Sequence, residues 1–194
     1  MRSVHLGPDP KRPLWVRLSL RCHDGDGGAD AADTDCQIPA YFPACSPGQH
    51  LRVFKSNDVP KPIPDSNATG VTSNLFVGPG AGTIARAALL YNITHTFDSD
   101  LDMFLTPPGG TQMDVCSDNG SLSDNFTNTV LDSTCATSVA SGSAPFAGCY
   151  QPETSFASLG GTLAEGVWKF KAADDAGGDS GTITSWAMIF CINP

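Results

Sequence analysis

The chain has 194 residues and carries 11 Lys and Arg against 20 Asp and Glu, a formal net charge of -9 at pH 7. Because the chain is acidic, it has no positive electrostatic field to attract phosphate backbones or anionic lipid. We therefore expect no nucleic-acid partner. No apolar run approaches the ~20 residues that span a bilayer, so we expect no membrane partner. Hydrophobic residues make up 40% of the chain, enough for one core, and 20 Gly with 15 Pro favour short strands and turns over helices.

The first part of the chain divides into two segments. Residues 1–21 are charged, rich in proline and without a period, which predicts a disordered leader. Residues 22–58 form an acidic linker that contains cysteine and begins with Cys22-His-Asp-Gly-Asp-Gly-Gly-Ala-Asp-Ala-Ala-Asp-Thr-Asp-Cys36. This run resembles a thrombospondin type 3 calcium repeat, and the resemblance implies calcium ligation by Asp24, Asp26, Asp30, Asp33 and Asp35. An EF-hand fits less well, and a solvated acidic linker without a specific ligand is the alternative interpretation.

From Val59 onward the sequence predicts strands. Residues 71–77 form the first, and residues 88–97 show the clearest alternation, in which every second side chain from Leu89 to Phe97 is large or aromatic. Leu101, Met103 and Leu105 then share one face, so in an extended segment Asp100 and Asp102 project away from the core. Pro107 to Gly110 predicts a turn before residues 111–116.

Two further segments complete the all-β pattern. Residues 167–171 alternate and lead into an acidic turn, and residues 183–192 form a last strand that is apolar on both faces. We therefore predict one β-sandwich over residues 59–194.

Aspartates are concentrated in two turns that each run into a hydrophobic strand. Clustered carboxylates repel one another unless a positive charge lies among them, and oxygen ligands on short turns are what Ca²⁺ selects. Because the loops at one end of a sandwich lie together, we expect calcium ligands to converge there. The candidates are Asp65, Asp98, Asp100, Asp174, Asp175 and Asp179. The alternative is that each aspartate caps its own turn, the interpretation that we prefer for Asp102 and Asp118.

Seven cysteines occur in the chain, and export of the protein would pair most of them as disulfides. Spacing suggests Cys135 with Cys149 and Cys22 with Cys36, and the odd number leaves at least one cysteine unpaired or intermolecular.

A serine-protease signature in the chain does not predict catalysis. Gly178-Asp-Ser-Gly181 copies the nucleophile tetrapeptide of chymotrypsin-like proteases, but only residues 182–194 follow it and no segment supplies the catalytic base. His95 lies on the apolar face of its predicted strand, so we expect it to be a packed histidine. We predict no catalytic residue in this chain.

Five separated motifs resemble the P-domain, or homo B domain, of proprotein convertases over residues 59–193. They are Pro62-Ile-Pro-Asp65, Ile93 to Thr111, Ala144 to Pro152, Gly166-Val-Trp168 and Asp179 to Trp186. The resemblance implies a jelly-roll β-sandwich attached to subtilisin-like catalytic domains of kexin and furin relatives and of secreted bacterial proteases. It implies a secreted, non-catalytic domain that supports folding and stability, binds Ca²⁺ in several members and sometimes contacts the substrate. The expected partners are a protease catalytic domain in the same polypeptide, or an extracellular protein substrate.

The alternative function is a free-standing extracellular binding module for protein or carbohydrate. Its contacts would be exposed aromatic side chains, for which Phe104, Tyr150 and Phe156 are the candidates.

Overall fold

The computed structural model describes residues 15–16, 22–24 and 38–194. Most of the predicted leader and the predicted ligands Asp26, Asp30, Asp33 and Asp35 therefore lie outside the described residues, as does the suggested pairing of Cys22 with Cys36. The backbone of Asp24 ends a short strand, β2 (Cys22–Asp24).

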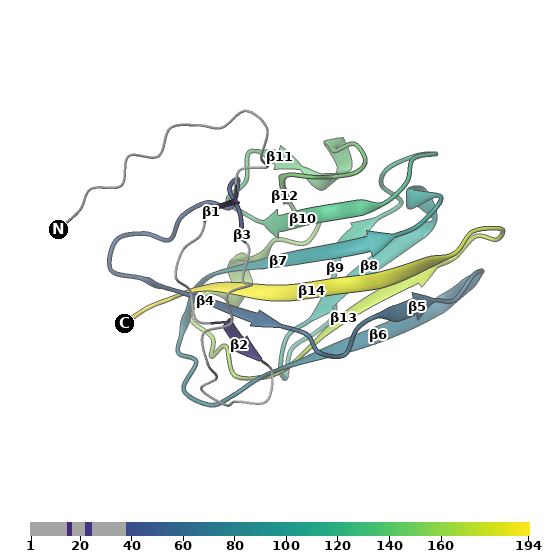
Figure 1. Cartoon of the computed structure of the whole chain (residues 1–194). Helices are drawn as coiled ribbons and strands as arrows, with labels where there is room; N and C mark the ends of the chain where they lie inside the picture. Colours follow the sequence, from purple (N-terminus) through teal and green to yellow (C-terminus); the bar gives the residue numbers. More distant parts are fainter. Residues whose placement is uncertain (1–14, 17–21, 25–37) are drawn as a thin grey trace.

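Two β-sheets stack face to face, as the sequence predicts (Figure 1). The larger sheet has the order β11-β12-β10-β7-β14-β4-β2, with β5 also paired to β14, and the smaller has the order β6-β13-β8-β9. The larger sheet contains β2, β4 (His50–Lys55), β5 (Lys61–Ile63), β7 (Ile84–Thr94), β10 (Phe126–Asp132), β11 (Thr137–Ser138), β12 (Cys149–Gln151) and β14 (Gly181–Ile192). The smaller contains β6 (Asn67–Val77), β8 (Leu101–Thr106), β9 (Met113–Ser117) and β13 (Gly166–Asp174).

The remaining elements are short. A separate two-stranded sheet pairs β1 (Trp15–Val16) with β3 (Ile38–Pro39). Over the described ranges the helical content is three 3₁₀ turns, η1 (Asp98–Asp100), η2 (Val139–Ser141) and η3 (Phe156–Leu159). None of the helices described here is long and apolar enough to cross a membrane.

The main core lies between the two sheets and follows the predicted alternation. Leu89, Tyr91 and Ile93 on β7 are buried, and β8 alternates buried with partly buried residues. Aromatic rings join the sheets: Trp168 on β13 lies 5.2 Å from Phe190 on β14, centroid to centroid. Close aromatic packing of this kind contributes large buried area and about 0.5–1.5 kcal/mol per pair beyond it.

A second hydrophobic cluster lies on the outer face of the larger sheet. Alternate residues of β14 divide between the two clusters, because Met188 and Phe190 point into the main core while Ala187 and Ile189 point outward. The outer cluster is completed by Val53, Ala88 and Val130, and by Ile38 from the segment before β4. This second cover is why β14 is apolar on both faces.

Strand pairing continues on the N-terminal side of the expected domain start at Val59. β4 pairs with β14 from Lys55 opposite Ala187 to His50 opposite Ile192. A disulfide joins Cys45 to Cys191 at the end of the same strand. The suggested disulfide between Cys135 and Cys149 is present, and Cys116 is a free, buried thiol.

We predict that Trp168→Ala destabilises the domain by about 3–5 kcal/mol, because it empties a fully buried site that packs on Phe190. The matched control is Val167→Thr, on the same strand but on the opposite, exposed face, for which the expected change is within about 0.5 kcal/mol. Urea unfolding measures both, and equal midpoints for the two variants would contradict this assignment of the core.

Candidate metal centre at the acidic end of the sandwich

Three acidic turns meet at one end of the sandwich, which we call the acidic pole. It comprises the turn between β5 and β6, η1, and the turn between β13 and β14, the hairpin at the right of Figure 1. The Gly178 amide donates to Asp65 Oδ1 at 3.1 Å, and the Asp175 amide donates to the carbonyl of Asp100 at 3.1 Å. The Thr96 hydroxyl donates to Asp179 Oδ1 at 2.7 Å. These backbone and side-chain hydrogen bonds fix the turns relative to one another.

Asp174 ends β13 inside the protein and faces His95. Both side chains are fully buried, and His95 Nε2 lies 3.2 Å from Asp174 Oδ2. The other ring nitrogen, Nδ1, lies 2.9 Å from the carbonyl of Phe97. Asp174 Oδ1 has no hydrogen-bond partner in the described structure. One oxygen of this buried carboxylate therefore bonds the histidine, and the other has no partner among the described residues.

Asp98 is the least compensated carboxylate of the acidic pole. Its side chain is fully buried, and neither carboxylate oxygen has a partner with hydrogen-bond geometry among the described residues. Burial raises its pKa from 3.8 to about 7, and Asp124 adds to the increase, while the Asn125 amide and His95 reduce it. The loop before β10 closes on this side chain, since a Cβ at Gly120 would meet Asp98 Cβ at 2.5 Å. A buried carboxylate in this position requires a proton or a cation.

Asp100 points to a different group of acids. Its pKa is raised by burial and then by the charges of Asp174, Asp179 and Asp175, with His95 acting in the opposite direction. His95 acts on the pKa of Asp98 as well, but the other side-chain charge that shifts Asp98 is that of Asp124. The predicted ligands thus share one end of the sandwich, where Asp98 contacts the loop before β10 and the Asp100 carbonyl contacts the turn after β13.

The residues present fit a cation in part. Within residues 38–194 and the shorter described segments, no group of three or more His, Cys, Asp and Glu side chains is arranged to hold a metal. Ca²⁺ takes six to eight oxygens and accepts backbone carbonyls and water among them. The unpartnered oxygens of Asp98 and Asp174 are the donors that such an ion would satisfy. Asp65 and Asp179 already accept hydrogen bonds from the turns.

Two residues of the acidic pole were not predicted as site residues. His95 was expected to be packed, which it is, but it also bonds Asp174. The signal was available in principle, because a histidine on a buried face needs a polar partner. Asn125 accepts a hydrogen bond from the His95 amide and affects the pKa of Asp98, and nothing local in the sequence indicates either contact.

The serine-protease tetrapeptide forms an exposed turn. Ser180 is at the surface between β13 and β14, while the His95 side chain beside it is fully buried. Both ring nitrogens of His95 are engaged, with Asp174 and with Phe97. The imidazole therefore has no nitrogen free to take a proton from Ser180.

Of the three aromatic residues predicted for a binding module, Phe156 is buried, which corrects that expectation, and Phe104 and Tyr150 are partly buried. Phe156 is buried in η3, Tyr150 packs edge-on against Phe146, and Phe104 lies beneath the Lys171 ammonium at 5.1 Å. Exposed apolar side chains are found instead at Phe76 and Val167, cross-strand neighbours on the smaller sheet. A groove of about 640 Å³, lined by Pro108, Leu163 and Trp168 among others, lies at the opposite end of β13 from the acidic pole.

Comparison with known proteins is consistent with this architecture. Leupeptin-inactivating enzyme 1 of Streptomyces exfoliatus is 27% identical over 129 residues, which cover 66% of this chain and 24% of that protein. The Aeromonas sobria serine protease in complex with its chaperone superposes with a TM-score of 0.52 at 16% identity, covering 76% of this chain and 28% of that one. The same protease alone gives 0.49 at 15% identity, covering 75% of this chain and 27% of that one. The chain thus spans about a quarter of the length of these proteins.

The superposition on the protease complex shows the fold, and the family match goes further. The family model of the proprotein convertase P-domain matches residues 84–190, from the start of β7 to near the end of β14 and over half of the chain. The chain belongs to the proprotein convertase P-domain family.

Proposed function

We propose that this P-domain is a non-catalytic, calcium-stabilised accessory domain of a secreted subtilisin-like serine protease. The observation that carries the calcium part is the pair of buried carboxylates with unpartnered oxygens, Asp98 and Asp174. A buried charge without a partner destabilises the fold by several kcal/mol, and a bound cation removes that penalty.

The protease part of the proposal rests on the P-domain family match and on the small share of each relative that this chain covers. P-domains accompany protease catalytic domains, and the matched part of this chain covers only about a quarter of each relative. We place the catalytic domain in the same polypeptide, with an extracellular protein as its substrate. Two disulfides among residues 38–194 support an oxidising, extracellular location.

The role proposed for calcium is thermodynamic linkage. Asp98 and Asp174 would supply buried oxygens, and Asp100, Asp175 and Asp179 would add nearby negative charge. The ion would supply the positive charge that these side chains lack. Because the unfolded chain does not hold these oxygens together, binding stabilises the folded form alone.

The alternative, a free-standing binding module, has less support, because its proposed contact residues are covered wholly or in part. Phe156 is buried, and Phe104 and Tyr150 are covered in part by neighbouring side chains. An aromatic ring that is packed inside the protein cannot stack on a sugar or a peptide.

We predict that Ca²⁺ at a hundredfold excess over its Kd stabilises the protein by about 2.7 kcal/mol, which raises the melting temperature by roughly 5–10 °C over that in EGTA. Mg²⁺ should restore little, since it demands a smaller, octahedral oxygen shell. Scanning calorimetry measures the difference. Asp98→Asn and Asp174→Asn should lose much of the response, whereas Asp118→Asn, an exposed matched control, should keep it. Identical melting curves in Ca²⁺ and EGTA would reject the calcium proposal.

We also predict that, in EGTA, stability falls as the pH rises from about 4 to about 7. The pKa of Asp98 is raised to about 7 in the folded protein, so the folded form retains a proton that the unfolded form releases near 3.8. This contribution is complete below the unfolded pKa and is lost as the pH passes through the folded pKa. Urea unfolding at several pH values measures it.

The control variants separate Asp98 from the other acids. Asp98→Asn should flatten the pH profile between 4 and 7, and Asp118→Asn should preserve the wild-type slope. A slope that survives in Asp98→Asn would assign the titration to other carboxylates, such as Asp100, whose pKa is also raised.

A further inference from the structure

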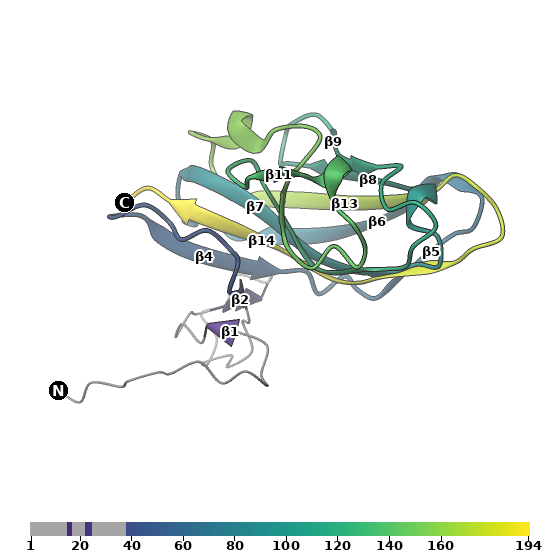
Figure 2. The same ribbon diagram turned by 90° about the horizontal axis from the view of Figure 1, so that it is seen from above.

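Residues 38–49, which we call the strap, cover the outer face of the larger sheet. Ile38 is buried in the outer cluster with Val53, Ala88, Val130 and Ile189, and Phe42 packs against the same cluster. The Tyr41 hydroxyl donates to the carbonyl of Asn128 at the end of β10 nearer the acidic pole. Figure 2 shows β4, which follows the strap, between β14 and β2. Without the strap this apolar sheet face would be exposed to water.

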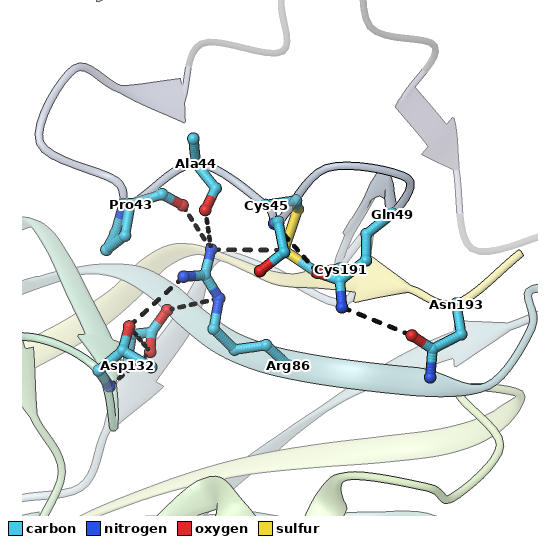
Figure 3. The surroundings of a disulfide bond; sticks show 10 residues. Pro43, Ala44, Cys45, Gln49, Arg86, Asp132, Cys191 and Asn193 are labelled. Carbon is cyan, nitrogen blue, oxygen red and sulfur yellow. Dashed lines mark hydrogen bonds and ion pairs between the residues drawn. A yellow bond between two sulfur atoms is a disulfide. The ribbon is translucent and has the colours of Figure 1, made fainter.

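An arginine holds the strap from the sheet side. Arg86 projects from β7, and its Nη2 donates to the carbonyls of Pro43 and, at 3.2 Å, Ala44 (Figure 3). Its Nε lies 3.3 Å from Asp132 Oδ2 at the end of β10, and Asp132 is fully buried. The guanidinium carbon also lies 5.2 Å from the centre of the Phe42 ring. One planar cation therefore joins two strands of the sheet to three consecutive strap residues.

A disulfide holds the strap at the adjacent residue. Cys45 is bonded to Cys191 near the end of β14, with 5.5 Å between their Cα atoms. Arg86 Nη2 lies 3.3 Å from Cys191 Sγ, so the ionic and covalent contacts meet at one point (Figure 3). Gln49 Nε2 adds a hydrogen bond to Asn193 Oδ1 at 3.4 Å.

We propose that Arg86 and the Cys45–Cys191 disulfide act as two parallel latches on the strap, so that only the loss of both uncovers the outer face. Each latch fixes a residue next to the other's attachment point, and either one keeps the strap at high effective concentration over its site. The strap therefore stays closed after reduction of the Cys45–Cys191 disulfide, as long as Arg86 is in place. This proposal is independent of calcium and of the protease assignment.

Opening the covalent latch is a two-electron step. Dithiothreitol attacks the Cys45–Cys191 bond through a mixed disulfide and leaves as its cyclic disulfide, and the two protein sulfurs end as thiols. Opening the ionic latch requires a variant that keeps the charge. Arg86→Lys retains a cation for buried Asp132, but a single ammonium cannot span the fork that also reaches Pro43 and Ala44.

Hydrogen exchange of residues 40–49, followed by mass spectrometry, tests the proposal on the full chain. We expect wild type in dithiothreitol and oxidised Arg86→Lys each to exchange within about threefold of oxidised wild type. Reduced Arg86→Lys should exchange at least about tenfold faster, more than the product of the single effects, because coupled contacts are not additive. Arg52→Lys, on β4 outside the latch, is the matched control and should behave as wild type.

Three results would overturn the proposal. They are full opening of wild type by reduction alone, full opening of oxidised Arg86→Lys, and a closed strap in reduced Arg86→Lys. Peptides from β8 and β13 must remain protected throughout, since their exchange reports unfolding of the whole domain. If Arg86→Lys exposes them, Phe42→Ala replaces it, because that change weakens the same latch from the strap side, and the same three results then decide.

Discussion

The arrangement of this domain depends on the need to cover both faces of β14. The strand lies in the middle of the larger sheet, paired with β7 on one side and with β4 and β5 on the other. Its alternate side chains are apolar in both directions, so one sheet cannot shield it alone. The smaller sheet covers one face and the chain before β4 covers the other. The apolar side chains on both faces of β14 therefore account for the two covers, the smaller sheet on one face and the strap on the other.

The two ends of β14 carry the polar chemistry. Its first residue, Gly181, lies so close to His95 that a Cβ there would meet the ring at 2.4 Å, which brings the turn after β13 against the buried histidine and Asp174. Its second-last residue, Cys191, lies beside the ion pair of Arg86 and Asp132. Buried carboxylates therefore occur at both ends of a strand whose middle is apolar: Asp132 pairs with Arg86 at one end, while at the other end Asp174 pairs with His95 and Asp98 has no partner among the described residues.

The sequence predicted what depends on local periodicity. Alternation over residues 89–95 and 101–105 correctly located the main core, and residues 183–192, predicted as a last strand that is apolar on both faces, belong to β14, which contributes to both clusters. It failed where contacts are non-local: Arg86 and Asp132 are 46 positions apart, and Cys45 and Cys191 are separated by 146. Nor did the sequence indicate that, within one 3₁₀ turn, Asp98 is buried while Asp100 is partly exposed. The strap has no period because turns and prolines shape it.

The burial of Cys116 protects the sulfur connectivity of the finished domain. Its thiol is fully buried, and burial raises its pKa to about 12. The thiolate is the species that attacks a disulfide, so near neutral pH almost none of this cysteine is in the reactive form. A reactive thiol beside the two disulfides described in residues 38–194 would be able to exchange with them. Burial between the sheets keeps Cys116 largely in its unreactive thiol form.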